Sequence, residues 1–412
     1  MRHGQAKEPY RASKKPMRFL IVSDSYPEYD RNSADFRLSQ LMEAMTEHGD
    51  VRFQAIGEDR QVAAIGREET TRYRNKLAET GIHIVDGGLG AALKQAAYDA
   101  VIIEWYYSAA PFVDLIRSVS PRTTIITDSV DVVFNRLLAK ARVSGKAEDR
   151  HEAESVRRLE LDTYSRSDLV LTVSDQDARI LNNEDATIRT FTIPNIHPLH
   201  DCVAPPADSG KTLVFVGSKS EANDDAMRYF CSEVLPLILA REPDIVFRVV
   251  GTVSMPELDE RISSCVERLG FVPDTQPCLV SSLISVAPLR FGGGMKGKVG
   301  EAMSFGLPVV STTTGAEGFG IEPGREAMVA DDPQAFADAV VRLIREPDLR
   351  DKIRIAGWRF IRDNYSDKAV RKRVAELTNR VSEITPKRLT FPKRAAFGVR
   401  QLWEQHISWR FQ

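Results

Sequence analysis

The sequence has few cysteines, and none of them are arranged as a metal site or a disulfide framework. Its 412 residues include four cysteines, and no two of these form a C-x-x-C pair. Widely spaced cysteines of this kind fit the reducing cytosol. No apolar run of 18 residues occurs, and residues 1–16 lack the apolar centre of a secretory signal. We therefore expect a cytoplasmic protein, with peripheral contact at the inner membrane face as an alternative.

Two common functional motifs are also missing. The sequence contains neither the G-x-x-x-x-G-K-[ST] order of a P-loop nor a G-x-S-x-G nucleophile elbow. Gly88–Leu93 resembles a dinucleotide fingerprint, but it ends in leucine and follows the third predicted strand rather than the first. We interpret this segment as an ordinary turn, so a nicotinamide enzyme is not favoured.

Net charge is small but unevenly distributed. The 56 basic and 58 acidic side chains give a formal charge of −2, whereas residues 1–18 and 386–412 are both strongly basic. The body between them is therefore acidic, which argues against nucleic acid as a partner. The basic and aromatic tail at 387–411 suits an anionic membrane surface. Packing of its aromatic side chains against the first domain is the simpler interpretation, and we prefer it.

Short β-rich runs alternate with helical patterns along most of the chain. The first run is Phe19–Ser23, and the pattern restarts at Leu213–Val216 after a proline-containing segment. Such alternation indicates βαβ units and parallel sheets, and hence an α/β protein with two doubly wound, Rossmann-like domains that face each other across a cleft. The predicted divisions are a first domain at 17–196, a linker at 197–210, a second domain at 211–365 and a closing helix with a tail at 366–412.

Individual elements follow from local signals. Ser174 is well placed to cap a helix over Asp175–Leu181. The first residue of that helix and Asp177 have a spacing also found at metal sites, but acids are favoured at a helix start in any case, so we predict no metal ligands. Longer helices are expected over Asp224–Ala240 and Glu257–Arg268. Ligands of such sheets bind at the carboxyl ends of the strands, so the cleft is the expected functional site.

One segment of the second domain combines glycines with cations. Three consecutive glycines at 292–294 follow a predicted strand at 283–287 and precede a helix expected from about Lys298. Glycines let backbone N–H groups approach a ligand, and a helix N-terminus attracts phosphate. Arg290 and Lys296 add further positive charge. These residues together predict an anion site suited to a nucleotide diphosphate.

Glu301 gives this segment a second function. It lies three residues after Lys298, so a helix places both side chains on one face. A carboxylate there suits the diol of a ribose better than it suits phosphate. The competing explanation is structural, because glycine-rich turns with lysines are common on surfaces and an acid early in a helix is favourable by itself. We favour the ligand site.

The same segment resembles a known family. The run from Arg290 to Thr312, followed by Gly315–Gly318, is similar to the donor-site signature of family-4-type glycosyltransferases, which have the GT-B fold. Supporting matches in the second domain lie at 215–217, 223, 235–236 and 270–274. Looser matches in the first domain lie at 27–33, 128–131, 173–174 and 193–195. The resemblance covers residues 17–365.

The resemblance implies an enzyme that moves a sugar from a nucleotide-diphosphate sugar to a glycan, lipid-linked or protein acceptor, with retention of the anomeric configuration. Cations would stabilise the charge that develops on the departing diphosphate, so neither a metal nor a cofactor would be needed. The implied catalytic residues are Arg290, Lys296, Lys298 and Asp131. The implied donor-binding residues are Gly217, Ser218, Asn223, Gly292, Gly293, Gly294, Glu301 and Glu317. Glu301 matches the family glutamate that contacts the donor ribose.

Three positions depart from the family pattern. The first of two family glutamates falls at Gly293, and a histidine of many relatives falls at Val133. The Arg-Lys pair that often follows Gly217 is replaced by Ser218 and Lys219. Two alternatives therefore stay open. One is a nucleotide-sugar 2-epimerase of the same architecture, and the other is a non-catalytic protein that binds a nucleotide sugar or acts as a scaffold.

Overall fold

The computed structural model describes residues 16–202 and 210–388. Residues 1–15 of the basic N-terminal segment, residues 203–209 of the predicted linker and residues 389–411 of the tail lie outside the described residues.

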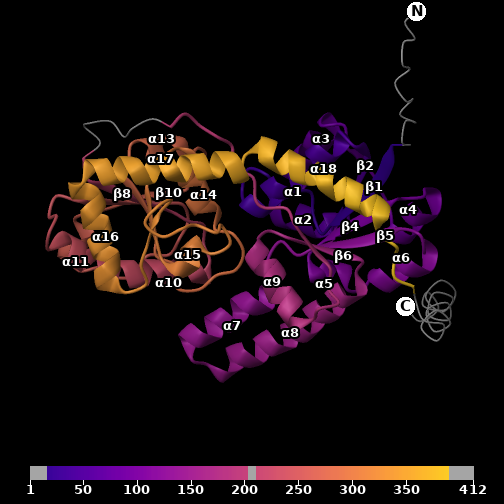
Figure 1. Cartoon of the computed structure of the whole chain (residues 1–412), viewed down its shortest axis with the longest axis horizontal. Coiled ribbons are helices and arrows are strands. Elements are labelled where there is room, and N and C mark those ends of the chain that lie inside the picture. The colour runs from indigo at the N-terminus through magenta and orange to yellow at the C-terminus, as the bar shows by residue number, and fades with distance from the viewer. Residues whose placement is uncertain (1–15, 203–209, 389–412) are drawn as a thin grey trace, which may run out of the picture.

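The first of two parallel β-sheets carries seven strands in the order β3-β2-β1-β4-β5-β6-β7 (Figure 1). All of its pairings are parallel. Its strands are β1 (Met17–Ser23), β2 (Gly49–Ala55), β3 (His83–Ile84), β4 (Ala100–Glu104), β5 (Thr124–Asp128), β6 (Leu169–Thr172) and β7 (Thr190–Thr192). The helices between them are α1 (Ser33–Thr46), α2 (Glu58–Ile65), α3 (Arg67–Glu79), α4 (Leu89–Gln95), α5 (Tyr106–Ala109), α6 (Val113–Val119), α7 (Val133–Ser144), α8 (Ala147–Arg166) and α9 (Asp175–Glu184).

The second sheet has six parallel strands in the order β10-β9-β8-β11-β12-β13. Its strands are β8 (Thr212–Val216), β9 (Val246–Val250), β10 (Val266–Gly270), β11 (Ile284–Ala287), β12 (Val309–Ser311) and β13 (Met328–Val329). Its helices are α10 (Glu221–Tyr229), the π-helix η1 (Phe230–Val234), α11 (Leu235–Leu239), α12 (Glu260–Ser263), α13 (Gln276–Val280), α14 (Gly297–Ser304), α15 (Thr313–Ala316), α16 (Pro333–Arg345) and α17 (Pro347–Asn364). The predicted fold class, two Rossmann-like α/β domains, is confirmed.

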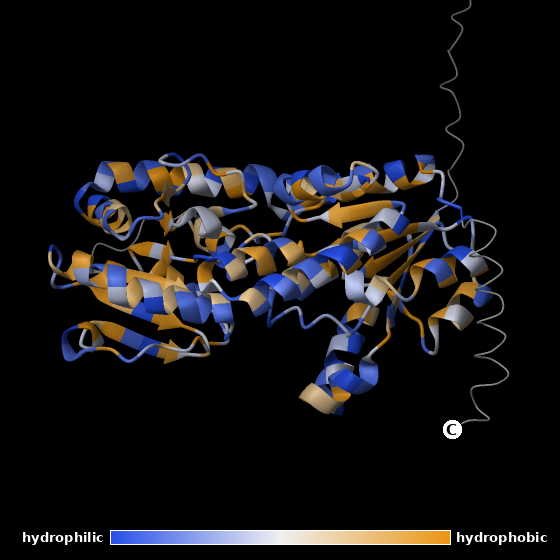
Figure 2. Ribbon diagram, turned by 90° about the horizontal axis from the view of Figure 1, so that it is seen from below, coloured by the Kyte–Doolittle hydropathy of each residue, from blue (hydrophilic) through white to orange (hydrophobic). Residues whose placement is uncertain are grey.

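The central strands are buried along their whole length and mostly apolar, because helices cover both faces of each sheet. Every residue of β4 and β5 is buried. Figure 2 shows the strands as an apolar layer and the helices with polar residues on their outer faces. A parallel sheet packed on both sides requires this pattern, which is why these strands were recognisable in the sequence.

Two helix predictions were wrong in detail. The segment predicted as one helix over Glu257–Arg268 contains the one-turn helix α12 and then β10, which extends the sheet beside β9. Val266–Gly270 is short and mixes apolar with charged residues, so its periodicity does not distinguish an edge strand from a helix. The helix predicted over Asp224–Ala240 is interrupted by η1, because Pro236 has no N–H group to continue a regular α-helix. The Ser174 cap is confirmed, since its side chain accepts a hydrogen bond from the Asp177 N–H.

The final helix returns the chain to the first domain. α17 lies over the second domain, and α18 (Asp367–Glu383) continues over the first (Figure 1). Val370, Val374, Leu377 and Val381 of α18 are buried in the core formed around β1 and α1. Along the described parts of the chain, no helix has the length and apolar character to cross a membrane.

The strand order places a ligand site in each sheet. It reverses direction between β1 and β4 in the first sheet and between β8 and β11 in the second. The loops that leave the carboxyl ends of neighbouring strands diverge at such a point and leave a crevice. The segment that follows β1 and those that follow β8 and β11 are therefore the structural candidates for binding.

Candidate functional site

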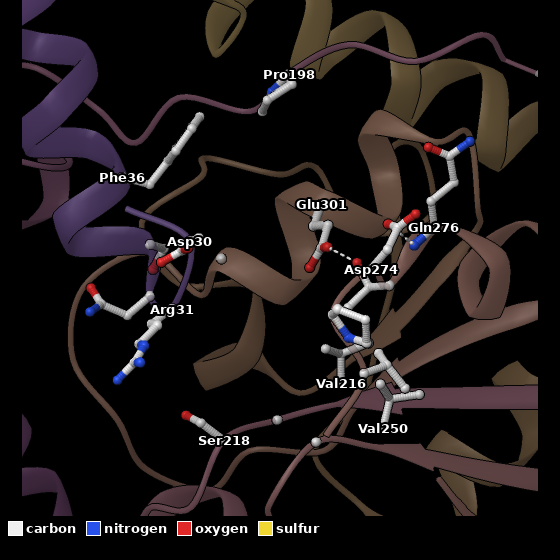
Figure 3. A pocket seen from close by; sticks show the side chains of 18 of the residues that line it. Asp30, Arg31, Phe36, Pro198, Val216, Ser218, Val250, Asp274, Gln276 and Glu301 are labelled. Carbon is white, nitrogen blue, oxygen red and sulfur yellow. Dashed lines mark hydrogen bonds between the residues drawn. The ribbon is translucent and has the colours of Figure 1, made fainter. Parts of the chain in front are cut away.

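A cavity of about 460 Å³ lies between the two domains. The second domain contributes the carboxyl ends of β8, β9 and β10 and the start of α14, and the first contributes the segment that leads into α1. Ile196 and the start of the linker at 197–200 close one side. Figure 3 shows Glu301 near the centre of the cavity, with Asp30 and Arg31 on one side and Asp274 and Gln276 on the other.

Glu301 is held by its neighbours. Its Oε1 accepts a hydrogen bond of 2.5 Å from the Thr275 hydroxyl. Burial raises the pKa of Glu301, and the hydroxyl bond and Lys298 oppose this shift. The other carboxylate oxygen remains available, and an acceptor oxygen in a half-closed cavity is suited to hold a diol.

Apolar and aromatic groups line the part of the cavity next to β8 and β9. Val216 and Val250 form part of this wall, and Phe271 stands 72% exposed on the loop after β10. On the linker side, His200 stacks on Phe305 with ring centroids 3.7 Å apart. Flat apolar walls beside a few oriented polar groups are typical of a small-molecule site that accepts an aromatic base.

The structure brings some predicted donor-binding residues to this cavity and not others. Gly217, Ser218 and Glu301 line it. Asn223 does not line the cavity but supports a residue that does. Its side-chain amide donates to the Ser218 carbonyl oxygen over 2.7 Å, and its Oδ1 accepts a hydrogen bond from Lys298 Nζ.

The predicted catalytic cations are all engaged by protein groups. Arg290 makes a two-pronged pair with Asp225 of α10, at 2.9 and 2.6 Å, and its guanidinium lies 5.3 Å from the Tyr229 ring centre. Lys298 lies 4.1 Å from the Phe215 ring centre, and burial lowers its pKa to about 7. Neither side chain lines the cavity. Their contact with a diphosphate stays a prediction.

Lys296 lies at the boundary between the domains. Its Nζ donates to the carbonyl oxygens of Gly293 and Gly294, at 3.1 and 2.7 Å. Glu317 lies 3.8 Å from it and also accepts a 2.7 Å hydrogen bond from the side chain of Gln176 in the first domain. Burial lowers the pKa of Lys296 despite the neighbouring acids.

Asp131 faces the glycine loop from the first domain. Its Oδ2 accepts a 2.7 Å hydrogen bond from Arg136, and its buried Oδ1 has no hydrogen-bond partner among the described residues. A Cβ atom on Gly293 would lie 2.0 Å from this Oδ1, so glycine is required there by the close approach of the two domains. Asp128 of the same motif instead forms a buried ion pair with Arg37, at 2.7 Å, and is structural.

Sequence reasoning missed several residues of the cavity. His197 is one: it is buried, its pKa is lowered to about 4 by burial, and its Nε2 has no partner within the described chain. The ring packs directly against Gly300, because a Cβ atom on that glycine would lie 2.2 Å from His197 Nε2. Arg31 is another. Arg31 belongs to the noted match at 27–33 and His197 begins the predicted linker, but a single sequence does not show which side chain of a loop turns inward.

Comparison with known proteins finds a family match within the second domain. Residues 210–346 match the family model described as glycosyl transferases group 1. The match covers most of the predicted second domain at 211–365. A curated relative, an uncharacterized 44.6 kDa protein in the cps region of Klebsiella pneumoniae, is 26% identical over 195 residues, which is 43% of this chain. The matched part spans about half of that relative, 48% of its length.

Solved structures share the fold of both domains. Anabaena Alr3699/HepE in complex with UDP superposes with a TM-score of 0.67 at 14% identity, over 88% of this chain and 100% of that one. Sucrose-phosphate synthase from Thermosynechococcus elongatus gives 0.66 at 15% identity, over 89% and 99%. The expected resemblance to glycosyltransferases of the GT-B fold is confirmed at the level of family and fold.

Proposed function

We propose that the protein is a glycosyltransferase that takes a sugar from a nucleotide-diphosphate sugar, with a UDP-sugar as the first candidate donor. The observation that carries this proposal is the cavity itself. It lies at the reversal point of the second sheet, where Glu301 presents a carboxylate to one side and the N-terminus of α14 begins at Gly297. A ribose diol and a diphosphate are the groups that such a carboxylate and such a helix terminus recognise.

The chemistry follows from where charge develops. When the bond between the sugar and the diphosphate breaks, electrons move onto the leaving phosphate, and preorganised donors and cations stabilise that state more than the ground state. The helix terminus of α14 and the nearby Lys298 and Lys296 supply this positive potential. We propose that the protein needs no metal ion for this step and retains the anomeric configuration. The complex of Alr3699/HepE with UDP and glucose supports a sugar donor of this class.

We further propose that the acceptor is part of a growing polysaccharide. The support is the curated relative, whose description places it in a cps region. Glycan, lipid-linked and protein acceptors remain the chemical classes to compare.

Binding of UDP should stabilise the protein, and this effect should depend on Glu301. Ligand that binds the native state raises the melting temperature by mass action. Replacing Glu301 with alanine removes the oxygen expected to hold the ribose and should weaken UDP binding roughly tenfold or more. Thermal shift measurements with UDP, GDP, dTDP and ADP, followed by product analysis of UDP-sugar hydrolysis, test this.

Glu267 provides the control, because it is exposed on β10 and outside the cavity. Its replacement by alanine should leave the UDP-induced shift unchanged. A wild-type protein that no nucleoside diphosphate stabilises would refute the proposal, and conversion of the donor to a C2 epimer would favour the epimerase.

A further inference from the structure

We propose that Arg31, from the first domain, is a cation that binds the diphosphate of the nucleotide, so that this group is held from both sides of the cleft. The inference rests on the proposed function and assigns a further binding residue to the same site.

The lining of the cavity is the first observation. Among the described residues that line it, Arg31 is the one lysine or arginine side chain. Arg290 and Lys298 lie outside the lining and are occupied by Asp225 and Asn223. Of the two residues that replace the family Arg-Lys pair, Ser218 lines the cavity but carries no charge, and the exposed Lys219 does not line it. Among the cations of the described chain, Arg31 is therefore the one that borders a diphosphate bound in this cavity.

The present partners of Arg31 are weak competitors. Its guanidinium lies 3.3 Å from Glu28 and 3.5 Å from Glu69, and its side chain is 45% exposed. Exposed ion pairs of this kind contribute little to stability. The guanidinium is therefore free to turn toward a ligand, and its planar fork matches the oxygens of a phosphate. Arg290, in contrast, is fixed by two hydrogen bonds to a carboxylate that is itself buried.

The backbone around Arg31 is also suited to an anion. α1 begins at Ser33, with Asn32 as its cap, and both residues line the cavity. α14 begins at Gly297 on the opposite side, and a Cβ placed on Gly297 would lie 3.1 Å from the Cβ and Oγ of Ser33. Two helix N-termini with partial positive charge thus meet at one edge of the cavity. A negative group in the cavity beside this contact would lie near the first-turn N–H groups of helices from both domains.

The consequence is a coupling between binding and domain arrangement. A diphosphate held by α14 of the second domain and by Arg31 of the first would favour the closed arrangement of the two domains. The reaction would then proceed with the donor shielded from water by the first domain. Figure 3 shows Asp30 and Arg31 on one side of the cavity and Asp274 and Gln276, which come from the second domain, on the other.

Isothermal titration of three ligands tests the assignment. UDP, UMP and uridine are titrated into the wild-type protein and into the Arg31→Ala and Arg31→Lys variants. We expect the Kd of UDP to rise roughly ten- to hundredfold in Arg31→Ala, as loss of a charge-assisted hydrogen bond predicts, while the Kd of uridine stays within twofold of wild type. Arg31→Lys should recover part of the UDP affinity, because it keeps the charge but loses the fork.

Lys76→Ala is the matched control. Lys76 is a half-exposed cation of α3 in the same domain and does not line the cavity, so its loss tests general electrostatic attraction. UDP affinity in Lys76→Ala should match wild type. If Arg31→Ala binds UDP as tightly as wild type, or if Lys76→Ala weakens UDP binding equally, the assignment of Arg31 is wrong while the proposed function stands. If the wild type binds neither UDP nor uridine, the proposed function fails first.

Discussion

At the scale of single residues, Lys298 connects the fold to ligand binding through its charge. Burial lowers its pKa to about 7, whereas an unfolded chain has a lysine pKa near 10.4. Between these two values the unfolded chain binds more protons than the folded one. This group therefore makes stability increase as the pH rises from about 7 toward 10.

The same property predicts that UDP binding takes up a proton. At pH 8 the free protein holds Lys298 mostly neutral, and a neighbouring diphosphate raises its pKa and so favours the charged form. Titration calorimetry in buffers of different ionisation enthalpy should show uptake of a fraction of a proton in the wild type. Lys298→Met should abolish that uptake. Lys219→Met, at an exposed lysine close to Ser218, should leave it unchanged. Binding of UDP without proton uptake would contradict contact between Lys298 and the diphosphate.

At the scale of elements, α18 ties the two domains into one unit. The helix follows the last helix of the second domain, yet its buried face lies in the core of the first. Leu377 is fully buried in that core, and Arg373 on the same helix is half exposed.

Replacing Leu377 with alanine should lower the free energy of unfolding by about 2–5 kcal/mol, because it removes buried methyl groups and leaves a cavity. The matched variant Arg373→Ala should change it by less than about 0.5 kcal/mol. Denaturant unfolding followed by circular dichroism measures both. An effect of Leu377→Ala no larger than that of Arg373→Ala would mean that α18 does not pack as described.

At the scale of the whole molecule, closure of the domains depends on a missing side chain. Gly293 of the second domain meets Asp131 of the first so closely that a Cβ would lie 2.0 Å from Oδ1. Gln176 and Glu317 make a second contact across the same boundary, at 2.7 Å. The position that carries a glutamate in the family pattern is thus occupied here by an acid from the opposite domain.

Gly293→Ala should hold the domains apart. We expect a larger radius of gyration by small-angle X-ray scattering with UDP bound, and at least a tenfold loss of donor turnover, while the melting temperature changes little. Adding Asp131→Ala should return the radius of gyration to the wild-type value, because it removes the obstructing atom. Gly90→Ala, in α4 with open space around it, is the control. An unchanged radius of gyration in Gly293→Ala would show that the contact does not limit closure.

The sequence by itself determined the two parallel sheets and marked the glycine-rich loop before α14 as a candidate ligand site. Buried strands covered on both faces are mostly apolar, and the glycine-rich loop before α14 is a local signal, so both can be recognised from neighbouring residues. The short edge strand β10 was missed, because its pairing with β9 depends on residues distant in the sequence.

Tertiary structure alone decided which side chains face the cavity. The cations near residue 295 were evident in the sequence, but Asp225 and Asn223, some 65 to 75 residues earlier, engage two of them. Arg31 lies more than 260 residues from Gly297, and packing of the first domain against the second brings its segment to the start of α14. Local patterns encode helices and strands, whereas the partners of a charged side chain depend on contacts made after the domains come together.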